Sequence, residues 1–127
     1  MKRLFALLLM AGLVLAGCAN PNGGEFRQVD AEEAKVMMDT EEHYIILDVR
    51  TEEEFAEGHI PGAICVPNET IGDEAPAELP EKEQLILVYC RSGNRSKQAA
   101  GKLAALGYDN IVEFGGIKDW PYEVVSE

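Results

Sequence analysis

Residues 85–96, Leu-Ile-Leu-Val-Tyr-Cys-Arg-Ser-Gly-Asn-Arg-Ser, indicate the fold class more clearly than any other part of the chain. The first five of these residues are apolar without alternation, which predicts a strand that is buried on both faces of a sheet. From Ser96 to Leu106 the apolar residues instead fall on one helical stripe, and Gly107 follows as a helix-ending glycine. The chain therefore passes from a central strand into a helix through a loop that begins at Cys90.

Strand and helix signals alternate on either side of this stretch. We predict further strands at residues 26–29, 44–47, 63–66 and 111–112. Two capping-box pairs predict helices between these strands, namely Asp30 with Glu33 and Thr51 with Glu54. Residues 25–127 are therefore expected to form one α/β domain, with a mainly parallel central sheet flanked by helices on both faces.

The loop from Cys90 to Ser96 carries the chemistry that the sequence offers. Ligands bind at the carboxyl ends of parallel strands, and free N–H groups at a helix start favour negative charge. Together with Arg91 and Arg95, these groups should hold the Cys90 sulfur as a thiolate and bind an anion beside it. A buried structural cysteine is the commoner role of a lone Cys, but it leaves the arginines, glycine and hydroxyls of the loop unexplained.

The N-terminus differs sharply in composition from the rest of the chain. Two basic residues precede an apolar run that is too short for a bilayer-spanning helix of about 20 residues and is typical of a signal peptide. The run ends at residues 15–18, Leu-Ala-Gly-Cys, which resemble the bacterial lipobox. This resemblance implies a lipoprotein signal peptide at 1–17, lipidation of Cys18, and a flexible tether within 18–24. The domain would then be anchored by lipid to a membrane of the cell envelope, outside the cytoplasm. An uncleaved anchor or an ordinary secretory signal is the alternative.

Composition argues against several classes of function. Lys and Arg total 11 against 23 Asp and Glu, a formal net charge of −12, and no basic cluster interrupts it. Nucleic-acid binding is therefore not expected. The three cysteines are too few and too scattered for a disulfide framework. With two histidines and no CxxC or HExxH motif, no metal centre is expected.

Four stretches in combination carry a family resemblance, although each alone is a weak signal. They are residues 47–50 (Leu-Asp-Val-Arg) with Glu54, 58–63 (Gly-His-Ile-Pro-Gly-Ala), 90–96, and 115–117 (Gly-Gly-Ile) with Trp120. Together they resemble the single-domain rhodaneses, which are thiosulfate-type sulfurtransferases, over roughly residues 26–122. The resemblance implies the rhodanese-like α/β fold and sulfur transfer that needs no metal or organic cofactor.

The resemblance also implies a role for each matching residue. Cys90 is the nucleophile that carries sulfur as a persulfide, and the substrate-binding loop comprises Arg91, Ser92, Gly93, Asn94 and Arg95. Asp48, Arg50 and Ser96 are expected to support this loop, and His59 to pack and form hydrogen bonds. Cys90 would take a sulfane sulfur from thiosulfate or a related anionic donor and pass it to a thiol, sulfite or cyanide acceptor.

Other functions fit parts of the pattern. Dual-specificity phosphatases share the rhodanese fold, but their Cys-x5-Arg loop requires arginine at position 96, and Arg95 comes one residue earlier. Phosphatase or arsenate-reductase activity is therefore less favoured. A persulfide carrier or interaction module without turnover is a second alternative. Cys65 lies in an apolar strand and is expected to pack as a small hydrophobe, with a resolving cysteine as the alternative. The sequence names no protein partner.

Overall fold

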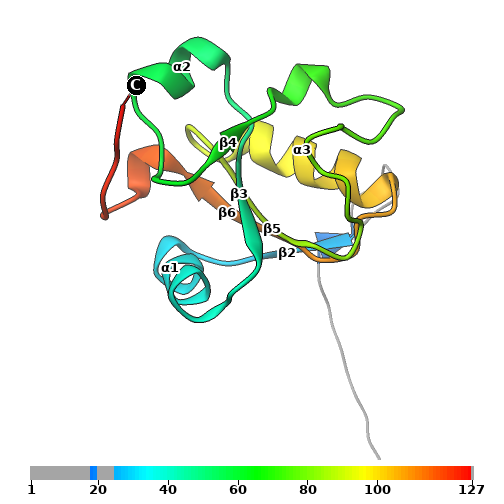
Figure 1. The fold of residues 1–127 in the computed structure, drawn as a ribbon, viewed down its shortest axis with the longest axis horizontal. Coiled ribbons are helices and arrows are strands. Elements are labelled where there is room, and N and C mark those ends of the chain that lie inside the picture. The colour runs from blue at the N-terminus through cyan, green and yellow to red at the C-terminus, as the bar shows by residue number, and fades with distance from the viewer. Residues whose placement is uncertain (1–17, 20–24, 127) are drawn as a thin grey trace, which may run out of the picture.

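The central sheet is mainly parallel, as predicted. The computed structural model describes residues 18–19 and 25–126, and Figure 1 shows the fold. Its six strands follow the order β1-β2-β6-β5-β3-β4. They are β1 (Cys18–Ala19), β2 (Glu25–Gln28), β3 (Tyr44–Asp48), β4 (Ile64–Cys65), β5 (Leu85–Cys90) and β6 (Ile111–Gly116). Among the described strands, β1 alone pairs antiparallel, with β2. The predicted signal peptide at 1–17 and positions 20–24 of the predicted tether lie outside the described residues.

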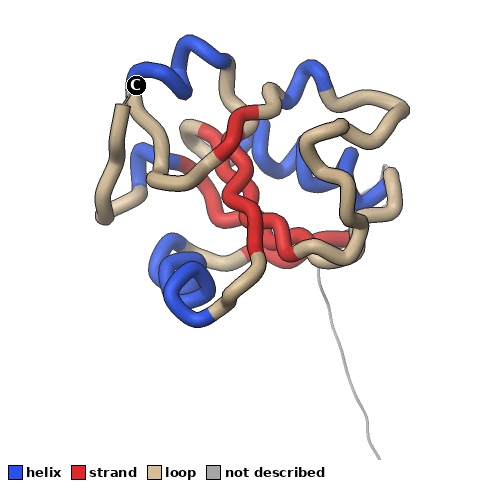
Figure 2. Tube along the Cα trace, in the orientation of Figure 1, coloured by secondary structure: helices blue, strands red, loops and turns tan. Residues whose placement is uncertain are grey.

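Helices lie on both faces of the sheet, which confirms the predicted layers (Figure 2). The helical elements are α1 (Ala31–Thr40), α2 (Glu52–Glu57), α3 (Asn94–Ala105) and the single 3-10 turns η1 (Asn68–Thr70) and η2 (Ile117–Asp119). Within the described ranges, no helix is long and apolar enough to cross a bilayer.

The buried strand β5 divides the core into two halves. Its side chains alternate, so that Ile86, Val88 and Cys90 join the cluster beneath α3. Leu85, Leu87 and Tyr89 join the cluster that also contains Ala34 of α1. Burying one large apolar side chain contributes roughly 1.5–3 kcal/mol, so both clusters stabilise the position of this strand. The last side chain of β5, that of Cys90, consequently faces α3.

Side-chain caps fix where α1 and α2 begin. The carboxylate of Asp30 accepts a hydrogen bond from the Glu33 N–H at 2.9 Å. At α2 the capping box is complete, because Thr51 Oγ1 accepts from the Glu54 N–H and Glu54 Oε1 accepts from the Thr51 N–H. Both predicted helix starts are confirmed. Helix α3 begins two residues before the predicted Ser96.

Strand β6 is longer than the two residues predicted for it. It runs to Gly116, because the pairing with β5 shifts register between Val88 opposite Glu113 and Cys90 opposite Gly116. Three steps on β6 therefore match two on β5, and Gly115 absorbs the extra residue with a left-handed φ of 95°. This bulge carries β6 alongside the end of β5, where the Cys90 loop starts. Strand β4 is shorter than predicted, with two residues in place of four.

Candidate functional site: the Cys90 loop

Cys90 is the last residue of β5 and lies at the carboxyl edge of the parallel sheet. It is buried, with 1% of its surface exposed. The chain then turns through Gly93, whose φ of 110° is left-handed and favours glycine, directly into α3. The Gly93 N–H donates a hydrogen bond to Cys90 Sγ at 3.0 Å. A backbone donor aimed at the sulfur stabilises negative charge on it.

The end of β6 supports the back of the loop by close backbone contact. A Cβ added at Gly116 would lie 1.9 Å from the carbonyl oxygen of Arg91, so this position accepts only glycine without displacing the loop. The N–H of Lys118 donates to the same Arg91 carbonyl oxygen at 3.2 Å. The end of β6 at Gly116 therefore packs directly against the backbone of the loop that follows Cys90.

A buried carboxylate, Glu113, joins β6 to the start of α3. It is 2% exposed and accepts hydrogen bonds from Ser96 Oγ at 2.5 Å and from the Gly115 N–H at 2.9 Å. Gln28 Nε2 on β2 donates to its second oxygen at 3.3 Å. Ser96, predicted to support the loop, is thus placed against Glu113, and its hydroxyl also lies 3.1 Å from the Gly93 carbonyl oxygen.

Sequence reasoning missed Glu113. The feature that could have identified it is the presence of an acidic residue within the otherwise apolar run Ile111-Val112-Glu113-Phe114. A charged residue at a position that the strand pattern buries requires polar partners. We predicted that the strand ended at Val112, so this conflict between charge and burial was not considered.

Asp48 and Arg50 form a buried ion pair at the end of the neighbouring strand β3. Arg50 Nε contacts both carboxylate oxygens of Asp48, and Arg50 Nη2 donates to Asp48 Oδ2 at 2.7 Å. The same Nη2 donates to the Gly58 carbonyl oxygen at 2.5 Å, which ties β3 to the residue after α2. Asp48 lies opposite Tyr89 in the sheet. The pair therefore lies on the strand next to β5, and within residues 25–126 it forms no hydrogen bond with the Cys90 sulfur.

The two arginines of the loop differ in their surroundings. Arg91 is exposed, as are Ser92 and Asn94. Arg95 instead forms a bidentate ion pair, with Nη1 and Nη2 at 2.8 and 3.1 Å from the two oxygens of Glu54. This hydrogen-bonded pairing lowers the pKa of Glu54 to about 2, against the opposing effect of burial. Arg95, which the sequence predicts to bind the substrate anion, is thus already paired with a carboxylate, whereas Arg91 is exposed.

The side chains of His59 and Cys65 contact Phe55 of α2 and the backbone of Arg50, respectively. The His59 ring stacks on Phe55 with a centroid distance of 3.8 Å, and its Nδ1 lies 2.8 Å from the Phe55 carbonyl oxygen. The thiol of Cys65, on β4, donates to the Arg50 carbonyl oxygen at 3.6 Å. Burial raises the pKa of Cys65 to about 11, so its thiol stays protonated at neutral pH.

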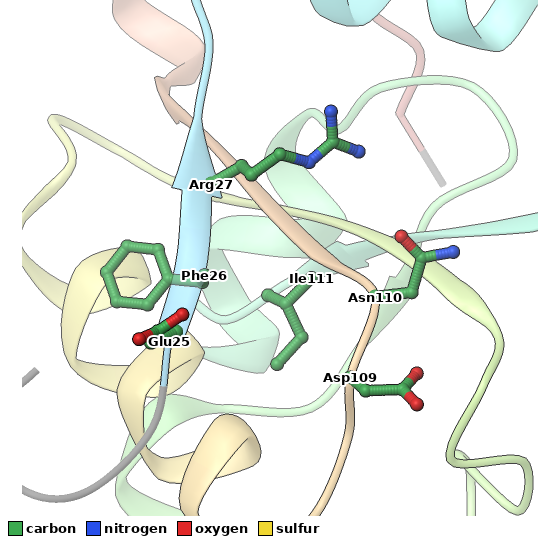
Figure 3. A pocket seen from close by; sticks show the side chains of 6 residues that line it. All are labelled: Glu25, Phe26, Arg27, Asp109, Asn110 and Ile111. Atoms are coloured by element: carbon green, nitrogen blue, oxygen red, sulfur yellow. The ribbon is translucent and has the colours of Figure 1, made fainter. Parts of the chain in front are cut away.

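A hollow of about 360 Å³ opens at the other end of the sheet, where β2 and β6 begin (Figure 3). The residues that line it are Glu25, Phe26, Arg27, Asp109, Asn110 and Ile111. Because β5 and β6 run parallel, Cys90 leaves the sheet at the opposite edge. The hollow shares no residue with the Cys90 loop, and we assign it no part in the chemistry.

Comparison with known proteins places this geometry in a family. Residues 30–122 match the model of the rhodanese-like domain. Over 78 residues the chain is 36% identical to thiosulfate sulfurtransferase PspE of Escherichia coli, covering 61% of this chain and 73% of that protein. A sulfurtransferase of Allochromatium vinosum is 35% identical over 94 residues, covering 73% of this chain and 86% of the relative.

A solved structure shares the arrangement of strands and helices. The solution structure of a rhodanese-like domain from Anabaena superposes with a TM-score of 0.70 at 30% identity, covering 79% of each chain. The family match spans both Asp48, at the end of β3, and the loop that follows Cys90. On this evidence, the chain belongs to the rhodanese-like domain family.

Proposed function

We propose that this protein is a sulfurtransferase that carries a sulfane sulfur on Cys90. The observation that supports this most directly is the Gly93 N–H, which donates to Cys90 Sγ at 3.0 Å. The same N–H would stabilise the Cys90 thiolate before sulfur is transferred to it, and negative charge on the Cys90 persulfide after the transfer. The proteins named above as sulfurtransferases support the same reaction class.

The proposed reaction has two displacement steps. The Cys90 thiolate attacks the outer sulfur of a donor such as thiosulfate, the sulfur–sulfur bond of the donor breaks, and sulfite leaves with the electron pair. The enzyme then holds a Cys90 persulfide. An acceptor thiolate, sulfite or cyanide attacks the outer persulfide sulfur, and the Cys90 thiolate leaves. Neither step needs a proton donor, because each leaving group is a stable anion.

The dimensions of the loop favour sulfur over phosphate. A Cys-x5-Arg phosphatase needs an arginine at position 96 to grip phosphate oxygens. Here that position is Ser96, which is fully buried and donates to Glu113. An arginine could not replace it without breaking this contact, which supports sulfur transfer over phosphate hydrolysis.

Persulfide formation is the direct test of this proposal. Purified protein incubated with thiosulfate should gain the mass of one sulfur atom on the peptide that contains Cys90. Cys90→Ser should gain none, whereas Cys65→Ser should load like wild type. Phosphatase turnover without any persulfide would refute the assignment. Rapid loading without release to thiol, sulfite or cyanide would instead identify a persulfide carrier.

We also propose that the protein is a lipoprotein of the cell envelope, anchored through Cys18. The support for this is the Leu-Ala-Gly-Cys sequence at residues 15–18, which follows an apolar run. Stable attachment requires more than one acyl chain, because a single chain binds membranes only marginally. Wild-type protein made in bacteria should partition into detergent, and Cys18→Ala should not. Recovery of unlipidated wild-type protein in the aqueous phase would contradict the proposal.

A further inference from the structure

The Arg95–Glu54 ion pair sits beside the nucleophile and joins α3 to α2. Both terminal nitrogens of Arg95 donate to Glu54, and the two side chains are each 27% exposed. The hydrogen bonds that Arg95 donates to Glu54 raise the pKa of Arg95, against the opposing effect of burial. Arg95 lies in the first turn of α3, five residues after Cys90, and its charge is already matched by the carboxylate of Glu54.

Glu54 stays ionised at neutral pH, so its pairing with Arg95 does not depend on a change of protonation there. The pKa of Glu54 is lowered to about 2, chiefly by the Arg95 hydrogen bond, so the carboxylate stays ionised above pH 4. Glu54 is also held by Thr51, because the Oε1 that accepts from Arg95 Nη1 accepts hydrogen bonds from the N–H and hydroxyl of Thr51 as well. An arriving anion must therefore compete with a carboxylate that the helix start holds in place.

The surroundings add negative charge. Glu52, Glu53 and Glu57 of α2 are all exposed around the Glu54 position, and the whole chain carries a net charge of −12. Of the two loop arginines, Arg91 alone has no described side-chain hydrogen bond or ion pair within residues 25–126. A surface that carries one sign of charge lowers the local concentration of ligands of the same sign. A dianionic donor is thus opposed at long range and meets one uncommitted guanidinium at short range.

We propose that Glu54 determines donor specificity, by masking Arg95 so that the site favours organic persulfides of low charge over dianionic thiosulfate. This inference rests on the proposed sulfur transfer by Cys90. With such a donor, R–S–SH, the Cys90 thiolate bonds to the outer sulfur and the sulfur–sulfur bond of the donor breaks. The products are the Cys90 persulfide and the thiolate R–S⁻, so one sulfane sulfur moves and no external oxidant or reductant is needed.

The test is to remove the charge of Glu54 and keep its hydrogen bonds. Glu54→Gln retains an oxygen acceptor for the Thr51 N–H, as glutamine does in natural capping boxes. Glu53→Gln is the matched control, because it removes the same charge from the neighbouring exposed position on α2. Cys90 persulfide formation is measured by mass spectrometry as a second-order rate, with thiosulfate and with 2-hydroxyethyl persulfide as donors.

Freeing Arg95 should raise the loading rate by thiosulfate about tenfold in Glu54→Gln, within the range over which local charge changes association. Loading by 2-hydroxyethyl persulfide should change less than about twofold, since this donor gains little from a free guanidinium. Glu53→Gln should leave both rates near wild type. The double variant Glu54→Gln/Arg95→Gln should lose the thiosulfate gain, because the gain acts through Arg95.

Three outcomes would overturn the inference. An unchanged ratio of the two rates in Glu54→Gln would show that the carboxylate does not determine specificity. Equal loss with both donors, in protein that still unfolds cooperatively, would make the pair a structural brace. A gain that persists in the double variant would assign it to net charge instead of Arg95. Wild-type protein that accepts sulfur from neither donor would instead refute sulfur transfer itself.

Discussion

Glu113→Ala should destabilise the domain strongly, because this buried carboxylate accepts hydrogen bonds from three elements. The variant leaves the Gly115 N–H and Gln28 Nε2 without this acceptor, and the Ser96 hydroxyl keeps only weaker carbonyl partners. Each buried polar group that loses its partner costs about 1–3 kcal/mol, whereas Gln28 is exposed and can bond water instead. We expect a total loss of about 2–5 kcal/mol in the free energy of unfolding. Glu113→Gln keeps the shape and an acceptor, so its loss should be smaller.

Urea unfolding followed by circular dichroism measures this effect. With a slope of about 2 kcal/mol per molar urea, the midpoint of Glu113→Ala should fall by about 1–2.5 M. Glu42→Ala, which removes an exposed acid, should stay within about 0.5 kcal/mol of wild type. Persulfide loading should fall as well, because the same contacts position Ser96 and the loop. A Glu113→Ala midpoint equal to that of the control would refute the claim that this carboxylate holds the loop.

Three further predictions follow from contacts around the loop. Gly116→Ala forces a Cβ to within 1.9 Å of the Arg91 carbonyl oxygen and should lower persulfide loading at least about tenfold, whereas Gly72→Ala, with open space around it, should not. Burial raises the pKa of Cys65 to about 11, so its iodoacetamide labelling in a Cys90→Ser background should stay slow up to pH 9 and rise above it; a midpoint near that of a free thiol, about 8.5, would contradict this. The pKa of Glu54 is lowered in the folded state, so its ion pair contributes stability above about pH 4.5 that is lost as pH falls toward 2; the difference in Tm between wild type and Glu54→Ala should shrink across that window, and a constant difference would argue against the ion pair.

The order and type of the main elements could be predicted from local patterns. The apolar run at residues 85–89 has one stable location, the middle of a sheet, and the capping pairs at α1 and α2 satisfy helix-start N–H groups within four residues of sequence. These signals are local, so a single sequence carries them. The extent of β6 could not be predicted, because its last residues pair through a bulge whose partner strand lies more than 20 residues earlier.

The candidate site was predictable only in part for the same reason. Cys90 and its loop are contiguous in sequence, and the loop turns directly from a strand into a helix. The partners that set the electrostatics of this loop are distant in sequence. Glu54 meets Arg95 across 41 positions, and Glu113 meets Ser96 across 17. Charge pairing at such separations depends on tertiary packing, which no periodicity encodes.

Because side chains of β5 alternate between the two faces of the sheet, the number of residues in this strand determines which face the Cys90 sulfur occupies. Ile86, Val88 and Cys90 face α3, and Leu85, Leu87 and Tyr89 face α1. Exchanging one apolar residue of this strand for another of similar size costs packing energy and leaves the direction of the sulfur unchanged. Deleting a single residue between 85 and 89 would keep an apolar strand of nearly the same composition, but it would turn the sulfur to the opposite face. The strand therefore tolerates changes in the identity of these residues far better than changes in their number.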